Sequence, residues 1–144
     1  MTTPVHIAMF HHDGRGPELR CVHWNHNGTL PLAIDYYNPD DEYDDASLKH
    51  VLVLGPQALM ITPEEVIDYT RAGAAIAHHR PAAMFDLGKS EWLQSFNPRH
   101  LDKCVHFQIF FYDELLDIIA ERVECRTGGF AAPYRLVESE NPRT

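Results

Sequence analysis

The sequence of 144 residues contains few cysteines and no long apolar run. Its three cysteines, Cys21, Cys104 and Cys125, are widely spaced and form no C-x-x-C pair. This spacing excludes a disulfide framework and a cysteine-rich zinc knuckle, so we expect reduced thiols. The apolar stretches Val51–Leu54 and Ile109–Tyr112 are far shorter than the roughly 18–20 residues that a membrane helix needs, so we expect no membrane interaction.

Positive charge is also scarce. Lys and Arg together number 12 and Asp and Glu number 21, which gives a formal net charge of −9. An acidic chain is repelled by nucleic-acid phosphates, so we expect no nucleic-acid partner. The first residues, Met1–His6, show neither the basic start nor the apolar core of a secretion signal, and we therefore expect a cytoplasmic location.

The rest of the composition is that of a folded globular protein. Apolar residues make up 44% of the chain and charged residues 23%, close to the averages for soluble domains. The length predicts a single domain over residues 1–144. The last part of the chain loses its periodicity, so residues 136–144 are predicted to form a frayed tail.

Strand patterns dominate the first third of the chain. Apolar and polar residues alternate in Val5–Phe10, in Glu18–Trp24 and again from Leu30 to Tyr36. Asn27-Gly28 supplies the two residues most tolerant of the positive φ angles of a tight hairpin turn. These patterns predict a three-stranded antiparallel meander.

Two helices are predicted further along the chain. Thr62 and Glu65 have the spacing of a capping box, with a proline between them at the first helical position, which predicts a helix over Pro63–His79. Asp113 as a cap, followed by an apolar residue at every third or fourth position, predicts a second helix over Glu114–Cys125.

Shorter elements lie between these helices and before them. Ser90 is predicted to cap a short helix that extends to Phe96, and Asn97-Pro98 to begin a further turn. Leu48–Leu54 combines strand-favouring valines with flanking residues typical of helix ends, and we favour a strand. The predicted fold class is therefore α+β, with an antiparallel sheet of about four to five strands and the two main helices packed on one of its faces.

Histidine is abundant, with 10 residues, and neutral imidazole is a common metal ligand. Two of these histidines and an aspartate lie in the first predicted loop, and two more lie near the predicted hairpin turn, where neighbouring strands could bring them together. The candidate metal-ligating residues are His11, His12, Asp13, His23 and His26. No established ligand spacing accompanies them, so a divalent metal cofactor is only the alternative hypothesis.

The polar segment from Asn38 to Ser47 contains the densest charge in the chain. We expect it to lie in solvent as a loop, because a block of like charges is costly to bury. Its spacing does not match a helix-loop-helix calcium site. Its acidic side chains are the candidate contacts for a basic protein partner, namely Asp40, Asp41, Glu42, Asp44 and Asp45.

Two further patterns bear on catalysis. Cys104 and His106 lie two residues apart on one face of a predicted strand. An imidazole can activate a nearby thiol, so these two residues are the candidates for a catalytic pair. The segment Ala83–Ser90 has the outline of a phosphate-binding loop, but its interior is bulky and contains Asp86, which would repel phosphate. The pattern therefore does not predict nucleotide binding.

No complete catalytic motif is present, and the sequence leaves open whether the protein is an enzyme. The leading hypothesis is a small cytoplasmic binding or regulatory module that engages a basic protein partner through its acidic loop. The alternative is a metal-dependent or small-ligand-binding protein that uses the N-terminal histidines.

Overall fold

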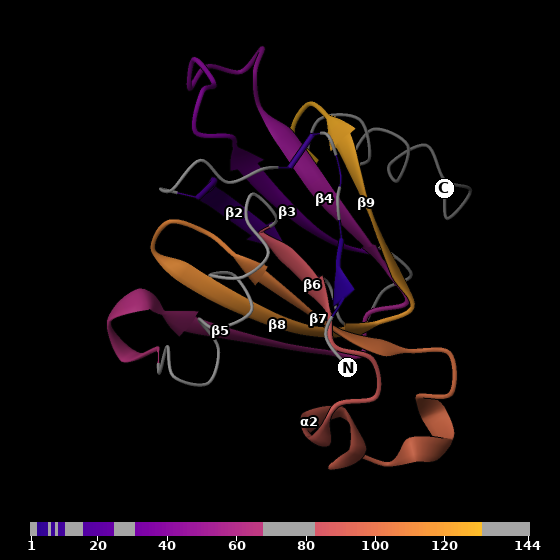
Figure 1. Ribbon diagram of the computed structural model, residues 1–144. Helices are drawn as coiled ribbons and strands as arrows, with labels where there is room; N and C mark the ends of the chain where they lie inside the picture. Colours follow the sequence, from indigo (N-terminus) through magenta and orange to yellow (C-terminus); the bar gives the residue numbers. More distant parts are fainter. Residues whose placement is uncertain are drawn as a thin grey trace, which may run out of the picture.

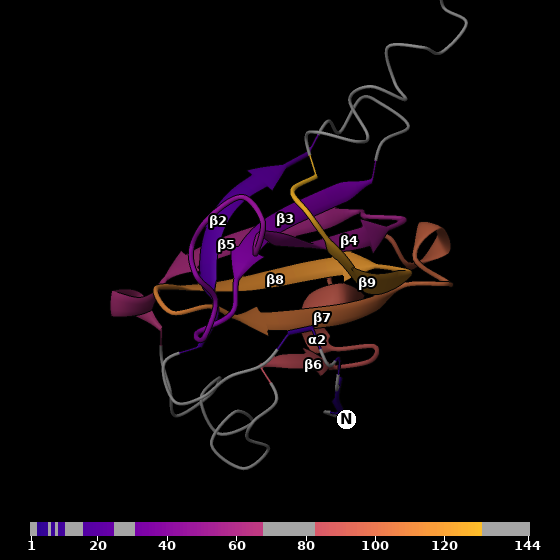
Figure 2. The same ribbon diagram turned by 90° about the horizontal axis from the view of Figure 1, so that it is seen from above.

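The structure is a computed structural model that describes residues 3–5, 7, 9–10, 16–24, 31–67 and 83–130. In these residues the chain forms two antiparallel sheets that pack against each other as two layers (Figures 1 and 2). One sheet has five strands in the order β1-β6-β7-β8-β5, and the other has four in the order β2-β3-β4-β9. The strands are β1 (Thr3–Pro4), β2 (Glu18–His23), β3 (Leu32–Tyr37), β4 (Lys49–Leu54), β5 (Ala58–Pro63), β6 (Met84–Asp86), β7 (Val105–Phe110), β8 (Glu114–Ala120) and β9 (Arg122–Thr127).

The described part of the chain contains little helix. It has one α-helix, α2 (Glu91–Gln94), and two single-turn 3₁₀ helices, η1 (Glu64–Val66) and η2 (Pro98–His100). The predicted α+β class with two main helices is therefore wrong, because the molecule is mostly β. None of the helices in the described ranges is long and apolar enough to cross a membrane.

The residues predicted to form a helix over Glu114–Cys125 belong instead to strands β8 and β9. Six of the seven residues of β8 are buried, because one face packs into the core between the sheets and the other lies against the α2 segment. A strand buried on both faces shows no alternation, and its continuous apolar run also contains helical spacings. The β-branched Ile118 and Ile119 were the better guide to its conformation.

The predicted helix over Pro63–His79 does not begin where the capping pattern indicates. Thr62 and Pro63 are the last two residues of β5, and η1 has no side-chain cap. Ile67 is extended, with φ −76° and ψ 129°, so the helical turn ends there. The remaining residues of the predicted helix, 68–79, lie outside the described residues.

The predicted N-terminal meander is correct only for its second and third segments. Strands β2 and β3 pair as an antiparallel hairpin, and β4 follows as the next strand, as favoured for Leu48–Leu54. The first predicted strand is displaced, because the strand at this end of the described residues is β1 (Thr3–Pro4), which belongs to the other sheet and pairs with β6. Ile7 and Phe10 form only an isolated bridge, so Val5–Phe10 is not a continuous strand. The Asn27-Gly28 turn lies outside the described residues.

The main hydrophobic core fills the space between the two sheets. It joins alternate residues of β3 and β4 to residues of β6, β7 and β8, together with Phe10. The rings of Phe10, Tyr36 and Phe111 meet in this core, with Phe10 lying 4.9 Å from Tyr36 and 5.6 Å from Phe111 between centroids. Edge contacts of this kind favour one arrangement of the rings, so they help to fix how the two sheets pack.

A continuous two-stranded ribbon passes from one sheet to the other. Strands β4 and β9 pair in the four-stranded sheet, and their continuations β5 and β8 pair in the five-stranded sheet. At the corner the Glu121 amide donates to the Leu54 carbonyl, and the Gln57 amide donates to the Ile119 carbonyl. Gly55 lies at this corner with φ +66°, a conformation that favours glycine. The bend gives the two layers a shared, hydrogen-bonded edge (Figure 1).

Candidate functional site

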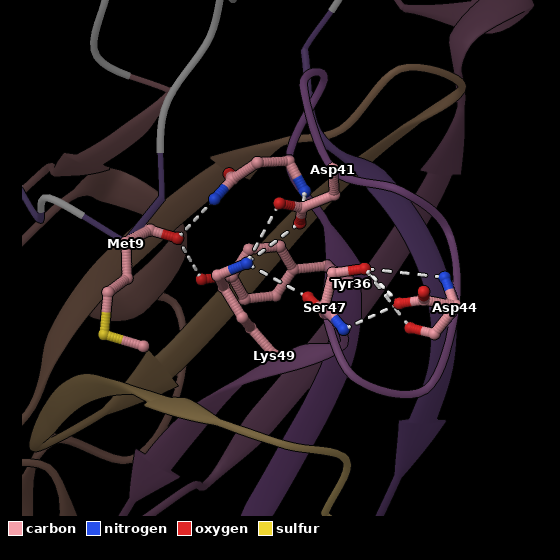
Figure 3. Close-up of polar contacts among 7 residues, drawn as sticks. Met9, Tyr36, Asp41, Asp44, Ser47 and Lys49 are labelled. Atoms are coloured by element: carbon pink, nitrogen blue, oxygen red, sulfur yellow. Dashed lines mark hydrogen bonds and ion pairs between the residues drawn. The ribbon is translucent and has the colours of Figure 1, made fainter.

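The acidic loop, residues 38–47, connects β3 to β4 and is held by hydrogen bonds at its base (Figure 3). The Asp41 carboxylate accepts from the Asn38 backbone amide at 2.7 Å. The Lys49 ammonium donates to both oxygens of the same carboxylate, at 3.0 and 3.1 Å, and to the Ser47 carbonyl at 3.0 Å. Asp41 is therefore paired with a cation and contributes to the shape of the loop.

A second set of bonds holds the tip of the loop. The Ser47 hydroxyl donates to the Asp44 carboxylate at 2.7 Å, and the Ser47 amide donates to the same carboxylate at 3.0 Å. These bonds stabilise the ionised form, so they hold the pKa of Asp44 below its usual value. The Asp44 side chain is therefore ionised and fixed in direction at neutral pH.

The start of the loop is joined to the N-terminal segment through the Met9 carbonyl. The Asn38 side-chain amide donates to this carbonyl at 2.8 Å, and the buried Tyr36 hydroxyl donates to it as well (Figure 3). Burial raises the pKa of the Tyr36 phenol far above its ordinary value, so this hydroxyl remains a donor. The Met9 carbonyl therefore links the start of the loop to Tyr36, which is part of the core between the sheets.

The remaining carboxylates of the loop lie in solvent. Asp40, Glu42 and Asp45 are exposed, as the sequence predicts for a block of like charges. Beside them lies Tyr43, whose side chain is 48% exposed and whose φ angle is +59°. Its ring packs against Tyr37 at 5.0 Å between centroids. The loop thus presents negative charge next to one accessible aromatic ring.

The structure describes only one of the predicted metal ligands. The Nε2 atom of His23 lies 2.8 Å from the Asp35 carboxylate, which also accepts from the Phe130 amide at 2.9 Å. The described ranges hold no group of three or more His, Cys, Asp or Glu side chains that could bind a metal ion. The other four predicted ligands, His11, His12, Asp13 and His26, lie outside those ranges, so the convergence of the five stays a prediction.

The predicted catalytic candidates Cys104 and His106 have separate environments. The Cys104 side chain packs in a small apolar cluster with Leu93, Leu101 and Ile119, and this burial raises the pKa of its thiol. His106 instead hydrogen-bonds through both ring nitrogens. Its Nδ1 lies 2.7 Å from the Ser90 hydroxyl and its Nε2 lies 2.6 Å from the Asp117 carboxylate.

Ser90, His106 and Asp117 therefore form a continuous hydrogen-bonded chain. The carboxylate accepts from Nε2–H, which leaves Nδ1 to accept from the serine hydroxyl. Gln108 donates to the same Asp117 carboxylate at 3.0 Å, and the Leu93 amide donates to the Ser90 hydroxyl oxygen at 3.2 Å. The roles of the three side chains, as hydroxyl donor, base and orienting acid, match those of a nucleophilic triad.

The base and the acid of this hydrogen-bonded chain are buried. The side chains of His106 and Asp117 are 7% and 6% exposed, and the Trp92 ring packs over His106 at 4.9 Å. A nearby hollow of about 400 Å³ lies between α2 and η2, and Ser90 is not among the residues that line it. Ser90 also caps α2, as the sequence predicts, so its hydroxyl has a structural role as well.

Lys89 has a structural role too. Its ammonium donates to the carbonyls of Leu101, Asp102 and Cys104 at 3.0, 2.8 and 2.6 Å. In a phosphate-binding loop the lysine at this position would contact the nucleotide. Here it holds the turn after η2 against the loop that precedes α2.

Sequence reasoning did not connect Ser90 and Asp117 to His106. Ser90 was recognised only as a helix cap, and Asp117 was assigned to a helix. The register of β7 and β8 brings the acid close, because Gln108 pairs with Asp117 and His106 pairs with Ile119. A strand assignment for residues 114–120 would have placed a buried acid beside a buried histidine, which is the signal that was missed.

Comparisons with protein-family models, with curated proteins and with solved structures find no match to this chain. Its function is therefore inferred from its own residues.

Proposed function

We propose that this protein is a small binding module that engages a basic segment of a protein partner through the acidic loop. One observation carries the proposal, namely that the loop holds exposed carboxylates on a backbone fixed by hydrogen bonds to Lys49, Ser47 and Met9. A loop that is already ordered loses less conformational entropy on binding. The proposal includes a cytoplasmic location, since the three cysteines are free thiols, as a reducing compartment favours.

Charge and aromatic contacts both support a basic partner. Negative charge attracts lysine and arginine side chains over several ångströms and steers their approach. The exposed ring of Tyr43 beside the carboxylates can pack against the methylene groups or the guanidinium plane of an arginine. We expect the affinity to fall as salt concentration rises, because the contacts lie in solvent.

The test compares two double variants in the binding of a fluorescein-labelled arginine-rich peptide. Glu42→Gln with Asp45→Asn removes two exposed loop charges and leaves the side chains that hold the loop, Asp41, Asp44, Ser47 and Lys49, unchanged. Glu91→Gln with Asp102→Asn removes the same charge from exposed positions elsewhere. The loop variant should bind about fivefold more weakly, with a smaller salt dependence, since each exposed ion pair contributes roughly 0.2–1 kcal/mol. Equal affinities of the two variants would exclude the loop as the binding site.

A second candidate function, acyl transfer by a serine nucleophile, rests on the hydrogen-bonded chain from Asp117 through His106 to Ser90. The polarity of this chain would let His106 accept the serine proton as the hydroxyl attacks a carbonyl. This function requires a carbonyl substrate to reach Ser90, which is half-buried at the start of α2.

Labelling with a fluorophosphonate probe tests the second candidate directly. Covalent modification that is lost in Ser90→Ala and retained in Ser95→Ala would establish a reactive serine, because both residues lie at the ends of the same helix. Absence of labelling in the folded wild-type protein would contradict the enzymatic function. The hydrogen bonds among Ser90, His106 and Asp117 would then have a purely structural role.

A further inference from the structure

Strand β5 (Ala58–Pro63) is the last strand at one side of the five-stranded sheet. It pairs with β8 along its inner side, and within the described residues no strand pairs with its outer side. Backbone amides and carbonyls on such an edge can accept another extended chain as an added strand.

The register identifies which backbone groups face outward. The Glu64 amide donates to the Asp113 carbonyl at 2.7 Å, directly beyond the last pair of the β5–β8 ladder. Because bonded and non-bonded pairs alternate along an antiparallel ladder, Ala58, Met60 and Thr62 direct their backbone groups towards β8. The amides and carbonyls of Leu59 and Ile61 therefore face outward. Pro63 also faces outward, where its missing amide removes no ladder bond.

The other described sheet edges differ from β5 in charge or in length. Charged side chains that discourage pairing occur along both edge strands of the four-stranded sheet, with Glu18 and Arg20 in β2 and Arg122 and Glu124 in β9. The far edge of the five-stranded sheet is β1, which has only 2 residues. The six residues of β5 include no charged side chain. This edge therefore lacks the charged side chains that discourage pairing at the edges of the other sheet.

Exposed apolar side chains also gather at this edge. Met60, Ile61 and Val66 are 44%, 45% and 68% exposed. Tyr112, at 51%, precedes Asp113, whose carbonyl binds the Glu64 amide. These four make up most of the exposed large apolar residues in the described chain, whose other members are Tyr43 and Phe96. Met60 and Ile61 follow each other in the strand, so each face of this edge carries an exposed apolar side chain.

A hollow of about 500 Å³ lies at the end of β5, where the strand meets the turn between β7 and β8. Its apolar side is formed by Ile61 and Pro63, and carboxylates from η1 and the turn complete it. The described lining residues include no lysine or arginine; they are Ile61, Pro63, Glu64, Glu65, Asp113 and Glu114. An apolar wall surrounded by carboxylates complements the methylene stem and charged end of a lysine or arginine side chain.

We propose that β5 binds an extended segment of a protein partner, which adds to the sheet as a further strand and inserts a lysine or arginine side chain into the carboxylate-lined hollow. Backbone hydrogen bonds to Leu59 and Ile61 supply sequence-independent affinity, and the hollow selects the basic residue. This surface shares no residue with the acidic loop, so the proposal goes beyond the function proposed above and does not depend on it.

The binding test uses a short fluorescein-labelled peptide of alternating valine and threonine with an arginine at each end. The two arginines allow either strand direction to bring one of them to the hollow. A matched peptide with a glutamate at each end has the same strand-forming centre. Saturable binding of the arginine peptide, with at least tenfold weaker binding of the glutamate peptide, is expected. Equal binding of the two peptides would overturn the selection of a basic residue.

Two substitutions of the same residue test the backbone contact. Ile61→Ala and Ile61→Pro both replace isoleucine with a smaller apolar side chain, but only the proline removes the outward amide. Ile61→Pro should bind the arginine peptide about tenfold more weakly than Ile61→Ala, the effect of one lost hydrogen bond of roughly 1.4 kcal/mol. Circular dichroism and the unfolding midpoint check that both variants fold. Equal affinities for the two folded variants would exclude strand addition at this edge.

A third comparison tests the hollow without altering the strand. Glu65→Gln should weaken binding of the arginine peptide about threefold, whereas Glu91→Gln, which removes one exposed charge from α2, should leave it unchanged. The loop variant that carries Glu42→Gln and Asp45→Asn should also retain the affinity at this surface, which separates failure of this proposal from failure of the acidic-loop proposal. An unchanged affinity in Glu65→Gln would contradict the role of the hollow.

The same variants distinguish a foreign segment from a second copy of this chain. If light scattering showed a dimer that Ile61→Pro dissociates and Ile61→Ala does not, the occupant of the edge would be another copy, and the proposed partner would be wrong. A wild-type protein that is monomeric at the concentrations of the peptide assay, and that binds the arginine peptide, supports the proposal.

Discussion

His106 on β7 and Asp117 on β8 form a buried acid–base pair, with Nε2 of the histidine 2.6 Å from Oδ1 of the aspartate. A second pair, between Glu124 and Arg126, has nearly the same length of 2.7 Å, but its side chains are 35% and 47% exposed. The two pairs have similar lengths, but we expect their loss to change the free energy of unfolding by different amounts. Removing one member of a buried pair leaves its partner without a hydrogen bond, whereas water replaces the missing member of an exposed pair.

We predict that Asp117→Ala lowers the free energy of unfolding by about 2–4 kcal/mol, because it leaves the donors of His106 and Gln108 buried and unsatisfied. The control Glu124→Ala should leave the midpoint of urea denaturation almost unchanged. Asp117→Asn keeps one acceptor oxygen and should lie between the two. A midpoint for Asp117→Ala equal to that of the control would show that the pair contributes nothing to stability.

The corner between the sheets provides a second prediction. A Cβ atom at Gly55 would lie 2.7 Å from Cγ of Glu121 and would require the left-handed backbone at φ +66°. Gly128 has a similar φ of +82° but no atom within 4 Å of such a Cβ. Gly128→Ala should therefore cost only the backbone strain of about 1–2 kcal/mol, and Gly55→Ala should cost more.

The excess cost at Gly55 has its own control. Adding Glu121→Ala to Gly55→Ala removes the contacting atoms and should return the loss of stability to that of Gly128→Ala. Thermal or urea unfolding of the three variants and of Glu121→Ala measures the coupling. Strict additivity in this double-mutant cycle would show that the contact with Glu121 has no energetic effect.

The ionisation of Glu114 provides a pH-dependent prediction. Desolvation, together with the nearby charges of Asp113 and Glu18, raises the pKa of Glu114 above its ordinary value of 4.5. The folded protein therefore binds a proton here more tightly than the unfolded chain, so stability falls as pH rises from 4.5 through the higher folded pKa. At pH 7 the Glu114 carboxylate is charged, and its charge lowers the stability of the folded state. Glu114→Gln removes this charge and should therefore raise the unfolding temperature at pH 7.

The advantage of Glu114→Gln should shrink as the pH is lowered towards 4.5 and below, because the wild-type carboxyl then becomes neutral in both states. Glu42→Gln, on the exposed loop, controls for the change in net charge and should have a smaller effect at pH 7. A gain in stability that does not change with pH would contradict the shift at Glu114.

The reactivity of the cysteines provides a fourth prediction. Burial raises the pKa of Cys125 to about 11 and also raises the pKa of Cys104, whereas Cys21 lies exposed on β2. Only the thiolate reacts readily with iodoacetamide. At pH 8 we therefore expect rapid modification of Cys21 and slow modification of the other two, with all three reacting in urea. Mass spectrometry of tryptic peptides gives the rates, and rapid labelling of Cys104 in the folded protein would reveal an activated thiol.

The sequence predicted the local features of this fold better than its long-range pairing. The strands β2 and β3 and the caps at Ser90 and Asn97 were predicted from neighbouring residues, and all were correct. The strand predicted around His106 was also correct, and it is β7.

The errors occurred where tertiary burial determines the structure. Strand β8 lost its alternation because both of its faces are covered. Thr62 and Glu65 have the spacing of a capping box, but Thr62 and Pro63 lie at the end of an edge strand. The chain from Ser90 to Asp117 depends on the register of two strands, which a single sequence does not reveal. The exposed position of Glu42 and Asp45, by contrast, follows from charge alone.

The corner ribbon also has a consequence for the kinetics of folding. The hairpins β2–β3 and β7–β8 can form from residues close together in the chain, but β4 and β5 must find β9 and β8 across a long intervening segment. Closing that large loop costs chain entropy before the new ladder repays it. We therefore expect the docking of the ribbon to limit the folding rate, so that Gly55→Ala slows refolding as well as weakening the native state.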